Sequence, residues 1–449
     1  MTKRGLARIV YLGFFLCVGR SFANAQPPAK HEFTIRQAVE YAARNNVQVK
    51  NALLNIQSQQ QTNREITAAA LPSINGSFGI TDYLKLPTSL LPGEIFGQPA
   101  GTYIPVQFGT KYNSTANIQV QQLLFDGQVF IALQARATSI AFQTKNKEVT
   151  EEMIKTNIHK IYYQLVLSKT QIELLDANIA RLQKLSHDAT ELYKNGFAEK
   201  LDLDKISVQL ANLQTEKTKA LNGISIGYLG LKTLMGMPVQ DTLILTDKLT
   251  DEQVQEDFSN DTAYQHADRK EFQYLSLAKK LNEYNIKRYQ LSYIPTLSVV
   301  GAYSKNAQRN KFDMFKTGEW YTTSYLGFNL SVPIFDGFAR SARIKRARID
   351  LKQTENQLDN LKLTIDSEVE QAKINFKSAL STMSFQKKNM QLAEEVYNQT
   401  KKKFEVGTGS NTEITAAQTD LVTAQTNYIN SLYSAIIAKV DYLKATGKL

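Results

Sequence analysis

The stretch 404–418 reads FEVGTGSNTEITAAQ and interrupts a helical pattern that otherwise fills the C-terminal part of the chain. Its glycines allow two interpretations, a phosphate-binding loop or the turn at which one long helix reverses into another. A phosphate-binding loop follows a strand and carries a lysine, and this stretch has neither feature. Gly407 suits the left-handed position after a helix end, and Ser410 with Glu413 has the spacing of a capping box. The stretch therefore predicts a helix reversal.

The same landmark occurs earlier in the chain, and other landmarks recur with it in the same order. The corresponding pairs are LPSI at 71–74 and IPTL at 294–297, LFDG at 124–127 and IFDG at 334–337, and YKNG at 193–196 and FEVG at 404–407. Such self-similarity predicts two internal structural repeats. The first copy carries extra residues in the proline-rich segment 86–112, which we expect to be a long external loop.

These landmarks set the expected organisation of the chain. We place a signal peptide at 1–25, repeat 1 at 26–236, an acidic connector at 237–263 and repeat 2 at 264–449. Each repeat should contain a helix, two strands, a long helix, a tip turn and a return helix. The tip turns are 195–200 and 406–411. For the connector we expect a solvated segment with one short helix.

The N-terminus has the three parts of a secretory signal peptide. Basic residues precede the apolar stretch 9–18, and small residues end at Ala25, after which we expect cleavage. Cys17 raises the alternative of a lipid-modified cysteine, but Leu16 stands where lipidation needs a small residue. We therefore favour a cysteine that is lost with the signal peptide, which leaves a mature chain without thiol chemistry or disulfides.

Composition excludes several classes of protein. The chain has 449 residues, 43% of them hydrophobic, and after the N-terminus it contains no apolar run long enough for a transmembrane helix. The net charge of +11 lies partly in the signal peptide, and charged residues make up only 21% of the chain. With an export signal in front, this balance argues against a nucleic-acid partner.

The long helices carry the seam of a coiled coil. Between 158 and 193, apolar and small residues recur at alternating intervals of three and four, and the equivalent positions between 369 and 404 keep the same register. At a rise of 1.5 Å per residue, a helix from about 129 to 193 would be roughly 100 Å long. Such a rod needs packing partners along its length.

Four shorter segments change to a period of two. They are 74–81, 112–123, 297–304 and 321–332, and each has one apolar and one polar face. Their length suits outer-membrane strands, although soluble hairpins packed on helices fit the periodicity equally well. The export signal and the aromatic pair Trp320 and Tyr321, expected at a membrane interface, favour lipid. Four strands cannot close a barrel by themselves, so a membrane position would require an oligomer.

Together these features resemble the TolC family of outer-membrane efflux proteins over essentially the whole mature chain. The most specific matches are VGTGSNTE at 406–413 with its following helix, IRQAVEYAARNNVQVKNAL at 35–53, and VPIFDG at 332–337. The resemblance implies a mainly α fold with a membrane β-barrel. Long helices would form a coiled-coil barrel, and four strands per chain would join a shared trimeric barrel of 12 strands.

The resemblance also implies partners, location and role. The protein would be a homotrimer in the outer membrane of a Gram-negative bacterium, in contact with lipid and with a helical extension in the periplasm. It would act as a passive exit duct for a periplasmic adaptor (membrane fusion protein) and an inner-membrane transporter. The cargo, whether drug, metal ion or protein, and the particular adaptor and pump are not encoded in these motifs.

The same resemblance assigns candidate sites. Asp202 and Glu413 lie at equivalent positions in the two return helices and would narrow the periplasmic end as a gate. Acids in the first turn of a helix are also stabilised by the helix dipole, which would explain both residues without any pore. The gate and the dipole interpretations both stay open. Lys205 and Ala416 stand where a second pair of acids can occur in the family, which puts an acidic gate in doubt.

Further candidates follow from the tip turns and the strand ends. The adaptor-docking candidates are Gly196, Phe197, Gly407, Thr408 and Gly409, and the strand-to-helix turns are Phe125, Asp126, Gly127, Phe335, Asp336 and Gly337. A basic cluster between 340 and 348 could meet lipid phosphates, although a solvated helix face explains it more simply.

Enzymatic activity is not expected, because no nucleophile with a base, no paired acids and no cofactor loop is present. The four histidines lack metal-ligand spacing, so we expect neither a metal site nor a cofactor. The competing function is a periplasmic coiled-coil adaptor or bridging protein, which would explain the helices and the export signal but not four amphipathic strands.

Overall fold

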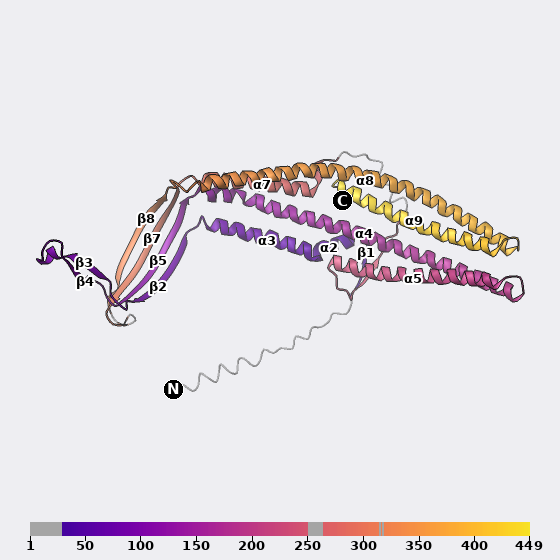
Figure 1. Ribbon diagram of the computed structural model, residues 1–449, viewed down its shortest axis with the longest axis horizontal. Helices are drawn as coiled ribbons and strands as arrows, with labels where there is room; N and C mark the ends of the chain where they lie inside the picture. Colours follow the sequence, from indigo (N-terminus) through magenta and orange to yellow (C-terminus); the bar gives the residue numbers. More distant parts are fainter. Residues whose placement is uncertain (1–28, 250–263, 314–315, 317) are drawn as a thin grey trace, which may run out of the picture. The chain divides into compact units, whose positions relative to one another are not determined.

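The computed structural model describes residues 29–249, 264–313, 316 and 318–449 (Figure 1). The signal peptide expected at 1–25, including Cys17, lies outside the described residues, as does the end of the connector. The chain forms two compact units. Unit 1 comprises Met1–Asn46, Asn157–Gln255 and Met383–Ser434, and unit 2 comprises Val47–Thr156, Glu256–Thr382 and Ala435–Leu449.

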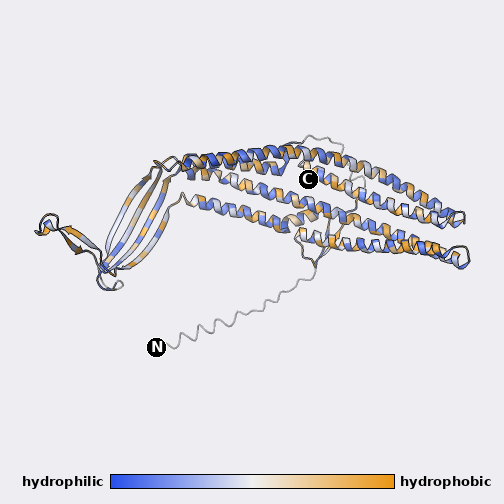
Figure 2. Cartoon of the chain, in the orientation of Figure 1, coloured by the Kyte–Doolittle hydropathy of each residue, from blue (hydrophilic) through white to orange (hydrophobic). Residues whose placement is uncertain are grey.

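A four-stranded antiparallel sheet belongs to unit 2. It contains β2 (Ser73–Asp82), β5 (Tyr112–Phe125), β7 (Thr296–Arg309) and β8 (Tyr321–Ser331), in the order β2-β5-β7-β8. All four expected strands are therefore present, and the central β5–β7 pair joins the first half of the sequence to the second. Figure 2 shows hydrophobic and hydrophilic residues alternating along them. The strands β2 and β8 form the two open edges.

The segment 86–112 is more ordered than a loop. It contains a hairpin of β3 (Thr88–Pro92) and β4 (Tyr103–Gln107), with a 3-10 turn η1 (Gly93–Phe96) between them. Its prolines concealed the strands, since proline within a strand normally argues against a sheet. In a two-stranded ribbon each strand has a free edge, so Pro92 and Pro105 fit without losing a required ladder hydrogen bond.

Helices make up most of the remaining chain. They are α2 (Ile35–Asn45), α3 (Val47–Ala68), α4 (Gly127–Lys194), α5 (Lys200–Met235), η2 (His266–Asp268), α7 (Lys270–Leu291), α8 (Ala339–Glu405) and α9 (Asn411–Ala445). The predicted seam is confirmed: from 158 to 189 and from 369 to 404, every seam position is buried or half-buried. Tyr193, beside the turn, is exposed. None of the described helices is both long and apolar enough to cross a membrane.

The first helix of the chain is broken at Asn46, whereas the sequence predicted one helix. Asn46 has an extended ψ of 132°, and its side-chain Nδ2 donates to the backbone oxygen of Leu234 at 2.6 Å. The nearby Gly236 approaches so closely that an added Cβ would lie 2.4 Å from the carbonyl oxygen of Asn45. The break is therefore a tertiary contact within unit 1 that local helix propensity cannot reveal.

The connector was expected to be solvated, but part of its described stretch is buried. Residues 242–245 form strand β6 (Thr242–Leu245), which pairs in parallel with β1 (Lys30–Phe33). Leu243 and Leu245 are buried. Tyr162 of α4 donates its hydroxyl hydrogen to the Phe33 carbonyl at 2.9 Å, which ties this small sheet to α4 within unit 1. The residues 250–263, where the short helix could lie, are outside the described part.

Candidate functional site

The two tip turns lie in unit 1 and have the same backbone conformation. Gly196 and Gly407 both adopt left-handed φ values, 81° and 79°. In each turn the N–H of the next residue reaches back to the last helical turn, from Phe197 to Leu192 at 2.8 Å and from Thr408 to Lys403 at 2.9 Å. This is the Schellman arrangement, and it satisfies carbonyls that a helix end leaves unpaired.

The return helices begin in different ways. The backbone N–H of Glu413 donates to Ser410 Oγ at 3.2 Å, one of the two hydrogen bonds of the expected capping box. In the first turn, Glu199 occupies the cap position of α5 without a side-chain hydrogen bond. Asn411 Nδ2 donates to the Asp202 carbonyl at 3.4 Å and so links the two return helices.

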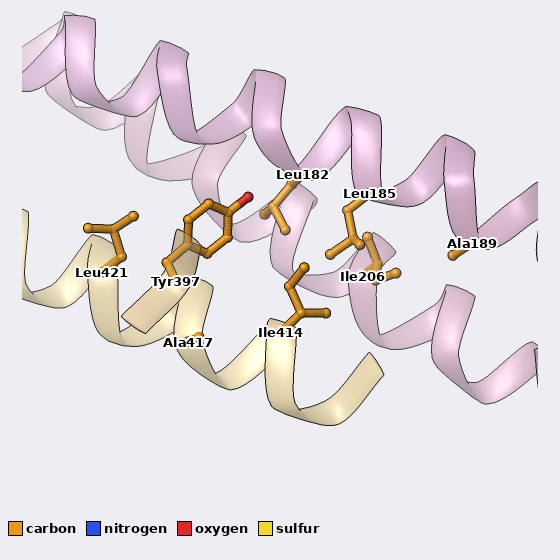
Figure 3. Packing of buried hydrophobic residues seen from close by; sticks show 8 residues of the cluster. All are labelled: Leu182, Leu185, Ala189, Ile206, Tyr397, Ile414, Ala417 and Leu421. Carbon is orange, nitrogen blue, oxygen red and sulfur yellow. The ribbon is translucent and has the colours of Figure 1, made fainter. Parts of the chain in front are cut away.

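A hydrophobic cluster holds the four tip helices together. Its residues point toward one another from α4, α5, α8 and α9 (Figure 3). The cluster comprises Leu182, Leu185, Ala189, Ile206, Tyr397, Ile414, Ala417 and Leu421. Burial of a single large apolar side chain contributes roughly 1.5 to 3 kcal/mol, so the turns cannot separate without exposing a substantial core.

Beyond this cluster, a polar layer crosses the interface of α4 and α9. Asn178 donates from Nδ2 to Gln425 Oε1 at 2.7 Å, and its Oδ1 accepts from Gln418 Nε2 at 2.9 Å. Arg181 also donates to Asn178 Oδ1 at 3.1 Å, and its guanidinium lies 5.6 Å from the ring centre of Tyr397. Buried polar pairs of this kind fix the register of neighbouring helices.

A pocket of about 780 Å³ lies between the two tip turns. Residues of both turns line it, including Phe197, Gly407 and Gly409. Its lining also holds four carboxylates, those of Asp188, Glu191, Asp202 and Glu405. The pocket is therefore a cleft with an acidic wall.

The two predicted gate acids occupy different environments. Asp202 is half-buried and lines the pocket, whereas Glu413 is exposed and is not among the lining residues. Lys205 and Ala416, which replace a second pair of acids, are also exposed. Within one chain the structure brings Asp202, but not Glu413, to the cleft.

Sequence reasoning missed three of the cleft acids. The three are Asp188, Glu191 and Glu405, at the ends of the long helices. Acids at such positions are normally interpreted as solvated. The other repeat has no acid at the equivalent positions, so the repeat did not mark them either. A hydrogen bond from Lys194 at 2.8 Å lowers the pKa of Glu191. The three acids share a pocket with Asp202 because the two tip turns, which are far apart in sequence, lie side by side.

The strand-to-helix turns have a capping role in both repeats. Asp126 Oδ1 accepts a hydrogen bond from the Gln128 N–H at 2.7 Å, and Asp336 Oδ2 accepts one from the Arg340 N–H at 2.8 Å. Each aspartate thus satisfies a free amide at the start of a long helix. Gly337 supplies a left-handed φ of 62° in the second turn.

Three of the remaining candidates are placed by the structure. Tyr321 begins β8 and is exposed, and Trp320 beside it is half-buried. Thr408 is exposed at the second tip turn. In the described part of the chain, no group of three or more histidine, cysteine or acidic residues is arranged to hold a metal ion.

Comparisons with known proteins agree with this geometry. A family model described as outer membrane efflux protein matches residues 267–448. The outer membrane efflux protein BepC of Brucella suis is 21% identical over 421 residues, which cover 93% of this chain and 86% of BepC. The outer membrane protein TolC of Vibrio cholerae is 18% identical over 338 residues, which cover 75% of this chain and 77% of TolC.

A solved structure shares the fold. The CmeC outer membrane channel of Campylobacter jejuni superposes with a TM-score of 0.74 at 15% sequence identity, covering 92% of this chain and 85% of CmeC. The matching family model and these relatives are similar to the chain as outer membrane efflux proteins of the TolC type, and the solved structure shows that the chain shares their fold.

Proposed function

We propose that the protein is an outer-membrane channel, a passive exit duct through which a periplasmic adaptor and an inner-membrane transporter discharge their substrate. One observation carries the proposal: the chain combines a membrane-length antiparallel sheet with long paired helices that end in two matching turns. BepC and TolC, by their names, are outer membrane proteins, and BepC is an efflux protein. A periplasmic bridging protein would have no use for such a sheet.

The channel would be a homotrimer. The edges of the sheet, β2 and β8, carry unpaired backbone groups, which hydrocarbon does not tolerate. The sheet has an even number of antiparallel strands, so its two edge strands, β2 and β8, run in opposite directions. If β8 of one copy lay beside β2 of the next, the two strands would therefore be antiparallel, as barrel closure requires. Helix α8 also leaves Leu363, Phe385 and Leu392 exposed in the single chain, a surface that neighbouring copies would cover.

The tip turns would form a gate at the periplasmic end. In a trimer, Asp202 and Glu413 from three chains would place six carboxylates around the opening, and this concentrated negative charge would favour the passage of cations. The pocket acids Asp188, Glu191 and Glu405 would add to this field. Gate opening would require the turns to move apart against the hydrophobic cluster of Figure 3.

Single-channel recording tests the function and the gate together. The mature protein in a planar bilayer should give discrete, cation-preferring steps. The double variant Asp202→Asn and Glu413→Gln should show a larger conductance or a weaker cation preference. The control variant, Glu173→Gln with Glu394→Gln, removes the same charge from exposed positions away from the turns. Unaltered conductance and selectivity in the gate variant would refute the acidic gate and leave the channel standing.

The same turns would receive the adaptor. Gly196, Phe197, Gly407 and Thr408 are exposed in these turns. Phe197 and Gly407 also line the cleft, whose size suits side chains of a helical hairpin. A photo-crosslinking residue placed at Phe197 or Thr408 in living cells should capture a periplasmic adaptor identifiable by mass spectrometry. The same residue at Phe108, next to strand β4 in unit 2, should capture none. A tip residue that never captures an adaptor would contradict the assignment.

A further inference from the structure

The basic cluster at the start of α8 is not used by the duct. It comprises Arg340, Arg343, Lys345, Arg346 and Arg348. Within the described part of the chain, Arg340 alone has an acidic partner: its Nη1 lies 3.3 Å from Asp336 Oδ2. The other four side chains are exposed, and no ion pair within the described residues involves them. Four positive charges therefore face outward within about two helical turns.

Helix α7 packs beside α8 and adds to this positive field. The two helices are joined by a hydrogen bond from Asn282 Nδ2 to Thr354 Oγ1 at 2.8 Å. Arg288 of α7 lies with its guanidinium 5.0 Å from the ring centre of Tyr289 and donates to its hydroxyl at 3.3 Å. Arg288 first, and then Arg346, lower the pKa of Tyr289, so both guanidinium groups lie near its phenol.

This convergence leaves a donor unused. The Nε of Arg288 is buried and has no hydrogen-bond partner among the residues that the structure describes. A buried donor without an acceptor is unfavourable, because it has lost its hydrogen bonds to water. An anionic oxygen bound between Arg288 and Arg346 would compensate the positive charges of both guanidinium groups.

An exposed apolar corner separates these cations from the membrane strands. Ile334, Phe335 and Phe338 are 93%, 75% and 74% exposed, and the two phenyl rings meet edge to face at 5.6 Å. Phe338 adopts a left-handed φ of 65°, unusual for a residue other than glycine. Along the chain the order is therefore lipid-length strand, aromatic corner, cationic helix, which matches the order of acyl chain, interface and headgroup in a lipid leaflet.

The fold itself does not require these cations. The equivalent corner of the first repeat, at the start of α4, carries Phe130, Leu133, Ala135 and Thr138 at four of the five positions. Its one cation, Arg136, is satisfied within the fold by donating to Thr67 Oγ1 at 2.6 Å. Two similar strand-to-helix corners thus differ in charge, which points to a ligand at one of them.

We propose that the corner formed by the end of α7 and the start of α8 binds the phosphate headgroup of an anionic phospholipid in the adjoining leaflet. This inference rests on the proposed membrane position of the strands. Arg343, Arg346 and Arg348 supply the long-range attraction, Arg288 and Tyr289 supply hydrogen-bond donors, and the aromatic corner packs on the acyl chain. Bound lipid would anchor the channel at a fixed depth.

Native mass spectrometry of the intact protein in neutral detergent tests the site. Phosphatidylglycerol and phosphatidylcholine are titrated separately. The triple variant Arg343→Gln, Arg346→Gln and Arg348→Gln is compared with a control that removes equal charge, Lys401→Gln, Lys402→Gln and Lys403→Gln. Each cation near an anionic lipid surface is worth roughly fivefold in binding, so the corner variant should retain phosphatidylglycerol about 100-fold less well.

The control should bind phosphatidylglycerol like the unaltered protein, and phosphatidylcholine should bind all three equally weakly. Arginine-to-lysine changes at the same three positions should keep most of the affinity, which separates charge from misfolding. Equal phosphatidylglycerol binding by corner and control variants would overturn the inference, as would complete displacement of lipid by inorganic phosphate. Channel recordings on the same samples show whether the proposed function survives such a result.

Discussion

At the scale of single residues, Asn178 shows how the tip helices are aligned. One amide side chain makes hydrogen bonds to Gln425, Gln418 and Arg181, and it does so at a position that is almost fully buried. An apolar contact would tolerate sliding of α4 along α9. The polar layer accepts only one register, because any other leaves buried groups unpaired.

Replacing Asn178 should therefore destabilise the tip. We expect Asn178→Ala to lower the apparent free energy of unfolding by roughly 1 to 3 kcal/mol, because Gln418 and Gln425 lose their partner in a buried layer. Asn212→Ala, at an exposed position of α5, should have almost no effect. Thermal unfolding followed by circular dichroism in detergent compares the two. Equal melting temperatures for the two variants would mean that the polar layer does not stabilise the packing of α4 on α9.

A second residue-scale prediction concerns pH. Burial first, and then the charge of Glu271, raises the pKa of Glu152 above its ordinary value, against the opposing effect of Arg269, Lys444 and Lys270. Glu152 Oε2 also has no hydrogen-bond partner. The folded state thus holds this proton more tightly than the unfolded state, and stability falls as pH rises from 4.5 through the raised pKa.

Glu152→Gln should accordingly raise the melting temperature at pH 7, where the wild-type carboxylate is ionised at a cost. The gain should shrink as pH falls toward 4.5, where wild-type Glu152 becomes protonated as well. Melting curves across this range provide the measurement, with the exposed Glu173→Gln as control. A gain that stays constant with pH would show that titration of Glu152 is not its source.

At the scale of elements, strand β8 has two faces of different character. Leu326, Phe328 and Leu330 form an exposed apolar face, while Gly327 and Asn329 lie on the other. An exposed apolar face of this length is unfavourable in water, and lipid would cover it. In the proposed channel, period-two alternation along one strand would separate the lipid side from the channel interior.

This difference predicts opposite tolerance at neighbouring positions. Phe328→Lys should impair assembly in the membrane, since a cation on the lipid face costs roughly 2 to 4 kcal/mol at the bilayer midplane and less toward its surfaces. Asn329→Lys, at almost the same depth on the other face, should assemble normally. The fraction of each variant recovered in outer-membrane vesicles measures the effect. Equal recovery would argue against lipid contact at Phe328.

At the scale of the whole molecule, the sheet is incomplete. Its order leaves β2 and β8 unpaired on their outer sides, and both edges come from the same unit. Natural sheets avoid long open edges, because such edges pair with other chains. If copies of this chain paired through β2 and β8 to close a barrel, no open strand edge would remain.

Engineered cysteines test the closure directly. Ser77→Cys in β2, combined in turn with single cysteines along β8, should give disulfide-linked dimers and trimers in at least one register. A cysteine at Ser304 in β7, which is paired on both sides, should give none with Ser77→Cys. Electrophoresis without reductant shows the products. Monomers throughout the β8 series would contradict a shared barrel.

The elements of this chain could be predicted from local patterns. Period-two alternation located β5 and β8 almost to the residue, and the 3,4 seam located the buried stripes of α4 and α8. The glycines at 196 and 407 marked the helix reversals, because a left-handed φ follows from residue type and helix ending alone. The β3–β4 hairpin was missed, since proline obscured its alternation.

The sequence by itself thus determined the elements, their faces and their turns, which depend on neighbours within a few residues. Tertiary structure alone decided three other features: the break at Asn46, the burial of β6, and the acidic cleft where Asp202 joins Asp188. Each depends on contacts between segments far apart in the chain. Such contacts stabilise the fold only after the chain has closed a long loop, at a cost in entropy. They depend on residues far apart in sequence, so no local sequence pattern predicts them.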